Sequence, residues 1–234
     1  MRKMAFIFCS SQQCEWVGKM GDRESKMGKL GNNSFMEHIR PRQIRAGALR
    51  FRATFCLGGL SFLAFIVLII TGVLLLFYYQ PGDKAFASLS ELDSALPYGG
   101  LVRSLHFWAG QMMVISVFLH MVRVVWSRAY RPLSELNWVT GVVLFGLTVM
   151  LDYSGYLLRG GQESGAAASV GKNLLTSLPG GQALATVFFG QPSPLNGSTL
   201  SMFVWHIFIL AGLAGFLQMF HFWRIRRGGG VRPL

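Results

Sequence analysis

Charged side chains are scarce in this sequence of 234 residues. Asp, Glu, Lys and Arg make up 14% of it, whereas they supply roughly a quarter of an ordinary soluble domain. Apolar residues reach 52% and the mean hydropathy is +0.42. Together these values exclude a typical soluble enzyme and indicate a membrane protein.

Cysteine is scarce as well. The chain has three, Cys9, Cys14 and Cys56, and none of them belongs to a CxxC or CxxCH motif. A disulfide framework is therefore not supported. The usual two-cysteine attachment of a c-type haem is not supported either.

Four apolar stretches are long enough to cross a bilayer, which takes roughly 20 residues of helix. We therefore predict an all-α fold, a transmembrane four-helix bundle. Between the spans, residues 80–100 carry the Pro, Gly and Ser of a loop, and the Gly-rich segment 159–199 has room for short surface helices. The predicted spans are residues 56–79, 105–126, 138–158 and 201–223.

The domain organisation follows from these spans. We predict an N-terminal cytoplasmic extension over residues 1–50, the bundle over residues 51–227 and a C-terminal tail over residues 228–234. The extension has too short an apolar run for a secretory signal. Two interpretations of it stay open, a partly disordered extension or a natural start at Met27 or Met36.

Basic residues predict the orientation, because cytoplasmic flanks collect Lys and Arg. Of the 22 such residues, all lie at the ends of the spans that face the two termini, except Lys84, Arg103, Arg159 and Lys172. Both termini are thus expected on the cytoplasmic side of the cell's inner (cytoplasmic) membrane. The net charge of +12 would suggest nucleic acid in a soluble chain. Here it flanks the spans, so we expect membrane lipid around the chain and no nucleic-acid partner.

Four of the five histidines lie inside the second and fourth spans: His106, His120, His206 and His221. An ionisable side chain within the membrane is costly and is a functional-site hypothesis by default. The simpler alternative is a set of neutral imidazoles that hydrogen-bond between helices. The spacings of 14 and 15 residues favour function, because they put the two rings of one helix ~21 Å apart on similar faces.

The two histidine-bearing spans run in the same direction, so their histidines face each other in pairs. His106 faces His206 on the outer side, and His120 faces His221 on the cytoplasmic side. Each pair offers two neutral nitrogen ligands, as a six-coordinate haem iron requires. The other two spans carry glycines 14 residues apart at matching heights, which leaves room for the edge of a flat macrocycle. These glycines are Gly58, Gly72, Gly141 and Gly155.

From residue 51 onward the chain resembles the cytochrome b family, and most closely its four-helix b6 type. The similarity lies in "FCLGG", "TGVLLLFYY", "YGGLVRSLHFWAG", "ELNWVTGVVL", "SGYLL" and "HFWRIRRGG". The resemblance implies a bundle with two b haems that carries electrons between the membrane faces, with quinone chemistry at each end. It implies a subunit of a quinol-oxidising complex.

The resemblance also implies roles for several other residues. Arg103 and Arg123 match arginines near haem propionates, and Cys56 matches a cysteine that holds a third haem through a single thioether. Arg226 and Arg227 match basic residues at the edge of the inner quinone site. For the arginines the alternative is an ordinary topology charge, and for Cys56 it is a small buried apolar side chain.

The implied partners are those of a bc-type complex. They are quinone or quinol, a chain like subunit IV or a C-terminal cytochrome b, and a Rieske protein or multihaem cytochrome c, in a homodimeric assembly. After "GYLL" the family usually has Pro-Trp and then an aromatic pair, whereas this chain has small residues and Arg159. We therefore expect the outer end to dock a different redox partner, for instance a multihaem cytochrome. The alternative is a quinol pocket completed by a partner subunit. The departures are Arg159, Gly160, Gly165, Ala166 and Ala167.

Two other functions stay as alternatives. One is a haem b membrane anchor of another respiratory dehydrogenase or multihaem complex that lacks a Rieske protein. The other is a metal-ion transporter, which histidines ~21 Å apart disfavour. Asp152 is the one acidic residue within the spans. It is expected either to accept protons near the outer haem or to hydrogen-bond with Tyr153 or a neighbouring helix.

Overall fold

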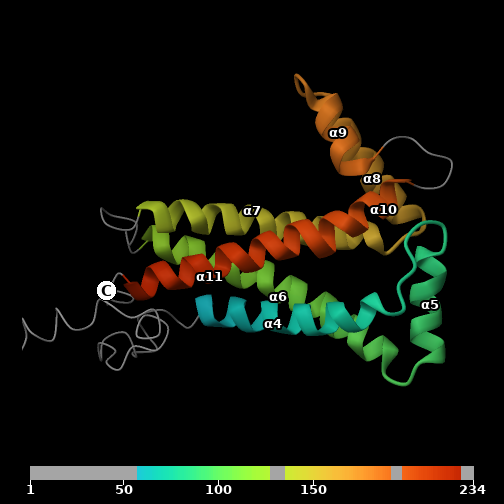
Figure 1. Ribbon diagram of the computed structural model, residues 1–234, viewed down its shortest axis with the longest axis horizontal. Coiled ribbons are helices and arrows are strands. Elements are labelled where there is room, and N and C mark those ends of the chain that lie inside the picture. Colours follow the sequence, from blue (N-terminus) through green and yellow to red (C-terminus); the bar gives the residue numbers. More distant parts are fainter. Residues whose placement is uncertain (1–56, 127–134, 191–196, 228–234) are drawn as a thin grey trace, which may run out of the picture. The chain divides into compact units, whose positions relative to one another are not determined.

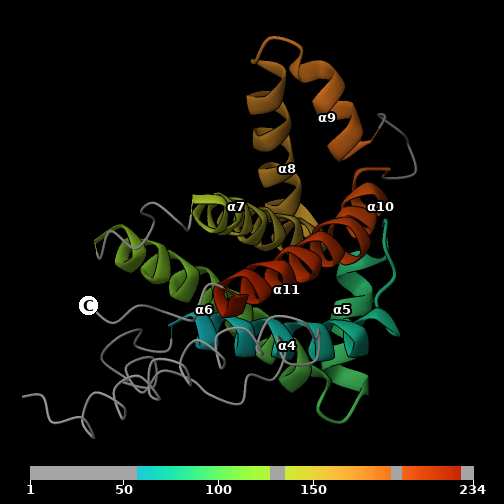
Figure 2. The same ribbon diagram turned by 60° about the vertical axis from the view of Figure 1, so that its left-hand side comes forward.

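A computed structural model describes residues 57–126, 135–190 and 197–227 of the chain, and structural statements below concern these residues. Four helical segments in it are long and apolar enough to cross a membrane. They lie side by side in Figures 1 and 2, and the described residues include no strand. The predicted all-α, four-span fold is therefore confirmed. The spans are α4 (Leu57–Leu76), α6 (Gly99–Trp126), α7 (Glu135–Leu158) and the continuous series α10 (Gly197–Val204), η2 (Trp205–Leu210) and α11 (Ala211–Arg227).

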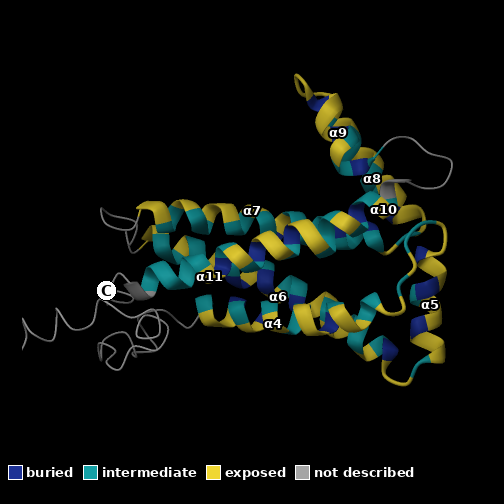
Figure 3. Cartoon of the chain, in the orientation of Figure 1, coloured by how far each residue is buried: buried dark blue, intermediate teal, exposed yellow. Residues whose placement is uncertain are grey.

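The bundle exposes many large apolar side chains and buries several small polar ones. Figure 3 shows where the buried and exposed residues lie along the helices. Large side chains such as Leu63, Ile70 and Phe216 are 57%, 57% and 70% exposed, as suits a surface that faces lipid. Ser61 on α4 and Ser116 on α6 are buried, and their hydroxyl oxygens lie 2.9 Å apart. Small residues of this kind let helices approach closely, so they set the spacing of α4 and α6.

The first connection contains a helix, α5 (Ala85–Ala95), where the sequence analysis expected a loop. Its buried residues Ala85, Ser88 and Leu92 share one helical face, which covers the start of α6. The helix ends before Pro97, because the residue preceding a proline disfavours the helical conformation. α6 then begins at Gly99, earlier than the expected residue 105. Glycine is required at this position, because any side chain there would collide with the backbone carbonyl of Leu92.

The joint between α7 and the next helix depends on two glycines. Gly160 and Gly161 have φ of +70° and +82°, a region that side chains other than glycine rarely adopt. A Cβ on Gly160 would also lie 2.9 Å from the backbone nitrogen of Phe86 in α5. Tyr79, which follows α4, donates a hydrogen bond of 2.8 Å to the carbonyl of Leu158 at the end of α7. These contacts join α5, α4 and α7 at one end of the bundle.

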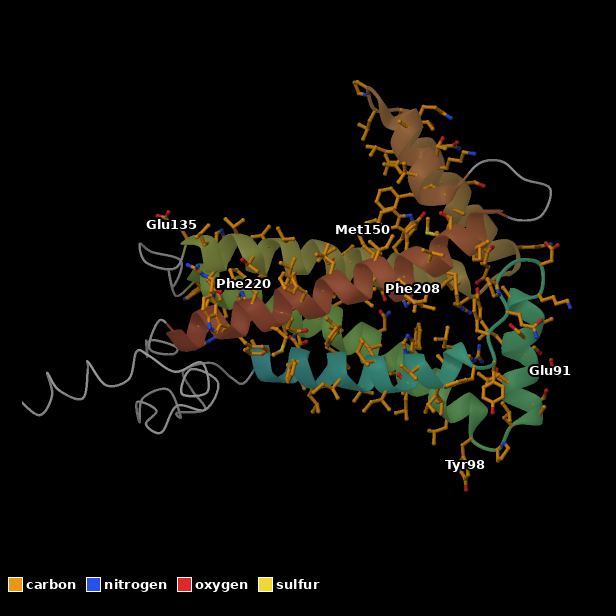
Figure 4. All side chains as sticks on the ribbon, viewed as in Figure 1. Glu91, Tyr98, Glu135, Met150, Phe208 and Phe220 are labelled. Carbon is orange, nitrogen blue, oxygen red and sulfur yellow. The ribbon has the colours of Figure 1, made fainter. Side chains whose placement is uncertain are left out.

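The connection between the third and fourth spans contains two short helices, for which the sequence left room. They are α8 (Gly161–Thr176) and α9 (Gly181–Phe189), which pack against each other. Tyr153 of α7 fixes α8, because its hydroxyl donates a 2.9 Å hydrogen bond to the carbonyl of Ala167. The end of the bundle with α5 and α8 is called the α5 end below. The opposite end, where α7 starts near the labelled Glu135 and α11 finishes, is called the C-terminal end (Figure 4).

Candidate functional site

The structure brings the four histidines together in the two pairs expected from the sequence. His106 on α6 and His206 on η2 form the first pair, toward the α5 end, with ring centroids 6.4 Å apart and ring planes at 61°. His120 on α6 and His221 on α11 form the second pair, toward the C-terminal end, and interact electrostatically. Each pair therefore joins the second and fourth spans.

Every one of these imidazoles lies against a glycine of a neighbouring helix. A Cβ built on Gly72 would lie 3.2 Å from Cε1 of His106, and one on Gly155 would lie 3.1 Å from Cε1 of His206. At the second pair, Cβ atoms on Gly58 and Gly141 would lie 3.5 Å and 3.6 Å from Cε1 of His120 and His221. The four matched glycines thus admit the imidazoles themselves. The room for a macrocycle edge that was expected at these glycines stays a prediction.

Hydroxyl groups fix the rings of the first pair. Oγ1 of Thr71 lies 2.9 Å from Nδ1 of His106, and Oγ of Ser154 lies 2.9 Å from Nδ1 of His206. Each hydroxyl also donates to a carbonyl of its own helix, at 2.7 Å for Thr71 and 3.1 Å for Ser154. A hydroxyl has one proton, so toward the imidazole it accepts and Nδ1 carries the hydrogen. The Nε2 lone pair of each ring is then free to bind a metal, a tautomer that such partners commonly fix.

A π-helical turn explains how histidines 15 residues apart on the fourth span match those 14 apart on α6. In a regular α-helix, 14 residues fall about 40° short of four turns, whereas 15 overshoot them by about 60°. Segment η2 contains the wider turn, since the N–H of Ala211 donates to the carbonyl of His206 five residues back. Such a turn absorbs one extra residue. His206 and His221 are thereby brought back onto one face.

A cavity of about 510 Å³ lies beside the first pair. Both histidines, Gly72 and Gly155 line it, and most of its other lining residues are apolar. A metal bonded at about 2 Å to one nitrogen of each ring holds the two centroids roughly 6 Å apart, which agrees with the observed 6.4 Å. The residues therefore fit a haem with two axial imidazoles. The described residues contain no group of three His, Cys, Asp or Glu side chains, so a metal site of protein ligands alone finds no support there.

Unsatisfied polar atoms mark the second pair. Buried atoms without a hydrogen-bond partner among the described residues are Oδ1 of Asn137, Oε1 of Gln218, Nδ1 of His221 and Nε of Arg224. Asn137 is in the first turn of α7, one turn before Gly141, and the other three lie within residues 218–224 of α11. A buried polar atom left unpaired costs about 1–3 kcal/mol. Their concentration here fits a site completed by a polar or metal-bearing group.

The structure places the remaining expected residues as follows. Arg103 lines the first cavity, and its Nε donates a 2.9 Å hydrogen bond to Oδ1 of Asp93 within an ion pair. Arg123 lies in the last turn of α6. Cys56 and the side chain of Arg226 lie outside the described residues, so their expected roles stay predictions.

Asp152 hydrogen-bonds to a neighbouring helix, which is one of the two roles expected from the sequence. Nε2 of Gln111 on α6 donates a 2.8 Å hydrogen bond to its Oδ1, so Asp152 links α7 to a neighbouring helix beside the first cavity. Its expected role as a proton acceptor stays a prediction. Thr71 and Ser154 were missed, although a signal exists: each directly precedes one of the matched glycines.

Replacing Gly155 by alanine is expected to displace His206. Its Cβ would lie 3.1 Å from the ring, and overpacking of this kind costs about 1–3 kcal/mol. We expect a lower unfolding temperature of the purified protein and loss of one low-spin haem. Gly146→Ala on the same helix is the matched control, since nothing lies within 4 Å of its Cβ. Equal behaviour of the two variants would contradict the packing role.

Deleting one residue from the π-helical turn is expected to be tolerated. Without Phe208, which is 63% exposed and labelled in Figure 4, the fourth span becomes a regular helix with its histidines 14 residues apart. Deleting Ile115, 54% exposed and between the histidines of α6, rotates one ring by about 100° instead. Visible spectra should show two low-spin haems in the first variant and one in the second. Loss of a haem in the Phe208 deletion would argue against the register role of the turn.

Comparison with known proteins agrees with this geometry. The family described as Cytochrome b/b6/petB matches residues 46–229. A menaquinol:cytochrome c reductase cytochrome b subunit of Geobacillus thermodenitrificans is 33% identical over 225 residues, 94% of this chain and 97% of that protein. A cytochrome b6 of Heliomicrobium gestii is 37% identical over 182 residues, 77% of this chain and 85% of that protein.

A solved structure has a similar fold. It is a chain of a hyperthermophilic respiratory Complex III, with a TM-score of 0.68 and 26% sequence identity. The similarity covers 77% of this chain and 49% of the solved one, so the present chain spans about half of its length. Paired histidines backed by glycines, on four spans that match this family from end to end, lead to one conclusion: the chain belongs to the cytochrome b/b6 family.

Proposed function

We propose that this chain is the di-haem cytochrome b subunit of a membrane quinol oxidoreductase complex, in which it carries electrons across the membrane between quinone and a redox partner. The observation that carries the proposal is the presence of two facing histidine pairs, each backed by two glycines. Cytochrome b proteins bind two b haems, and the two pairs provide four axial imidazoles for them. Relatives named as reductase subunits support the same assignment.

His106 and His206 would hold one haem, and His120 and His221 the other. The bound haem supplies a one-electron couple at its iron. The chain contributes the rest: Thr71 and Ser154 keep Nδ1 of the first pair protonated, so that Nε2 points to the metal. Apolar lining residues keep water from the cavity. The ~21 Å along α6 between the two levels spans most of a hydrocarbon core of about 30 Å.

The ends of the bundle would serve quinone and partner proteins. Arg226 and Arg227 would border a quinone site at the C-terminal end, with both termini on the cytoplasmic side. Relatives named menaquinol:cytochrome c reductase subunits support quinol as the substrate class, and a relative named as a cytochrome bc complex subunit supports a bc-type complex as the setting. We propose that this complex is a homodimer. Arg159, Gly160 and Gly161 line a polar cavity at the α5 end, where we expect the altered redox partner. The subunits that copurify with the chain, a Rieske protein or a multihaem cytochrome, decide that last point.

Alanine variants of the four histidines test the proposal. Each single variant is expected to lose one low-spin haem or convert it to high spin, because one axial nitrogen is removed, while the other haem stays. Reduced-minus-oxidised visible spectra and electron paramagnetic resonance of the purified protein measure this. His38→Ala, the one histidine outside the spans, is the control and should keep both haems. Two low-spin haems in all four variants would rule out the ligand assignment.

Cys56 is proposed to carry a third haem through one thioether. The match of "FCLGG" to b6-type relatives supports this, as does the position of Cys56 directly before α4. Haem staining should survive denaturing electrophoresis in the wild type and in Cys9→Ser and Cys14→Ser, and it should vanish in Cys56→Ser. An unmodified Cys56 peptide in the mass spectrum of an active complex would refute the link.

A further inference from the structure

Two cavities meet at the α5 end of the bundle. The first is the apolar cavity of about 510 Å³ beside His106 and His206. The second, of about 650 Å³, lies between α5, the start of α6 and the joint of α7 with α8, and its lining is largely polar and charged. The residues that line both cavities are Leu89, Arg103, Tyr156 and Arg159. This shared wall therefore contains two guanidinium groups.

One of these guanidinium groups is already neutralised. Arg103 forms an ion pair with Asp93 of α5, in which Nε contacts Oδ1 at 2.9 Å and a terminal nitrogen contacts Oδ2. Such a two-point arrangement matches the fork of a guanidinium to one carboxylate. The pair has no net charge, so Arg103 adds little positive potential to the cavity beside the histidines.

The other guanidinium group belongs to Arg159, an exposed residue. No carboxylate of the described residues forms an ion pair with it. It lies over the ring of Tyr156, with 5.5 Å between its central carbon and the ring centroid. The backbone N–H of Arg159 bonds to the carbonyl of Tyr156, and the two positive-φ glycines then turn the chain away. Glu163 lines only the second of the two cavities.

A haem held by His106 and His206 would bring its carboxylates to the first cavity. An ionised carboxylate is too costly to bury among apolar side chains without a partner. The shared wall, where the apolar cavity meets the polar one, is the place that suits the carboxylates. Arginine binds a carboxylate there with two parallel hydrogen bonds.

We infer that Arg159 is a positioning residue for the haem of the first pair, with its guanidinium bound to a carboxylate of that haem at the wall between the two cavities. The inference rests on the proposed function. Arg159 would supply the positive charge for the haem carboxylate, because the charge of Arg103 is paired with that of Asp93. Because an added cation disfavours the ferric state, Arg159 raises the midpoint potential of this haem above the value that it would have without the guanidinium.

Redox titration of the intact membrane protein tests the inference. In Arg159→Gln the midpoint potential of the first haem is expected to fall, so that electron sharing shifts toward the second haem by on the order of tenfold, about 59 mV for one electron. The second haem is the internal control and should not change. The two haems are told apart by their loss in His106→Ala and His120→Ala. Arg159→Lys keeps the charge without the fork and should give a smaller fall.

Glu163→Gln is the matched variant of opposite sign in the second cavity. It should raise the potential by much less than Arg159→Gln lowers it, because Glu163 does not reach the shared wall. If the midpoint potential shifted equally and in opposite directions in the two variants, Arg159 would act only through a long-range electrostatic field and not through an ion pair with a haem carboxylate. That result would overturn the inference. An unchanged potential with both haems bound would overturn it too, while leaving the proposed function intact. If Arg159→Gln fails to bind haem, the change in midpoint potential of the first haem in Arg159→Lys decides whether the inference holds. A wild-type protein without haem would refute the proposed function instead.

Discussion

The contact between an imidazole and the backbone of a neighbouring helix determines the interior of this protein. Each of the four histidine rings approaches a glycine so closely that a single added carbon would touch it. The contact sets how far apart the helices stand and where each ring points. In a bilayer, where apolar burial gives helices no advantage over lipid, packing of small residues is what holds spans together. The same glycines therefore serve assembly and ligand geometry together.

Polar contacts inside the bundle are few, and each has a local reason. Thr71 and Ser154 bond at once to a histidine and to a carbonyl of their own helix. Gln111 and Asp152 join α6 to α7 by one hydrogen bond. Buried donors and acceptors without a partner gather at the second pair. The two histidine levels thus differ: protein hydroxyls complete the first, and the second leaves more polar atoms for a bound group.

Much of this arrangement was predictable because a spanning helix is close to one-dimensional. Residue number along such a helix gives height and facing direction, so the spans, the histidine pairs and the levels of Gly58, Gly72, Gly141 and Gly155 followed from spacing alone. Helix α5 was missed because its burial depends on α6, which a local composition rich in Ser, Gly and Pro does not reveal. The Arg103–Asp93 pair was missed for the same reason, since it joins different helices, and so was the identity of Gln111 as the partner of Asp152.

The π-helical turn over Trp205–Leu210 also bears on how sequences of this kind are compared. An inserted residue in a straight helix rotates the direction in which every later side chain points. Such insertions are therefore usually assigned to loops. Here the extra residue lies within the membrane, and both histidines of the span keep their positions. When this chain is aligned with a relative whose two histidines stand 14 residues apart, the one-residue gap belongs inside residues 205–210. Placed in the preceding loop, the gap would leave one of the two histidines aligned with a residue other than histidine.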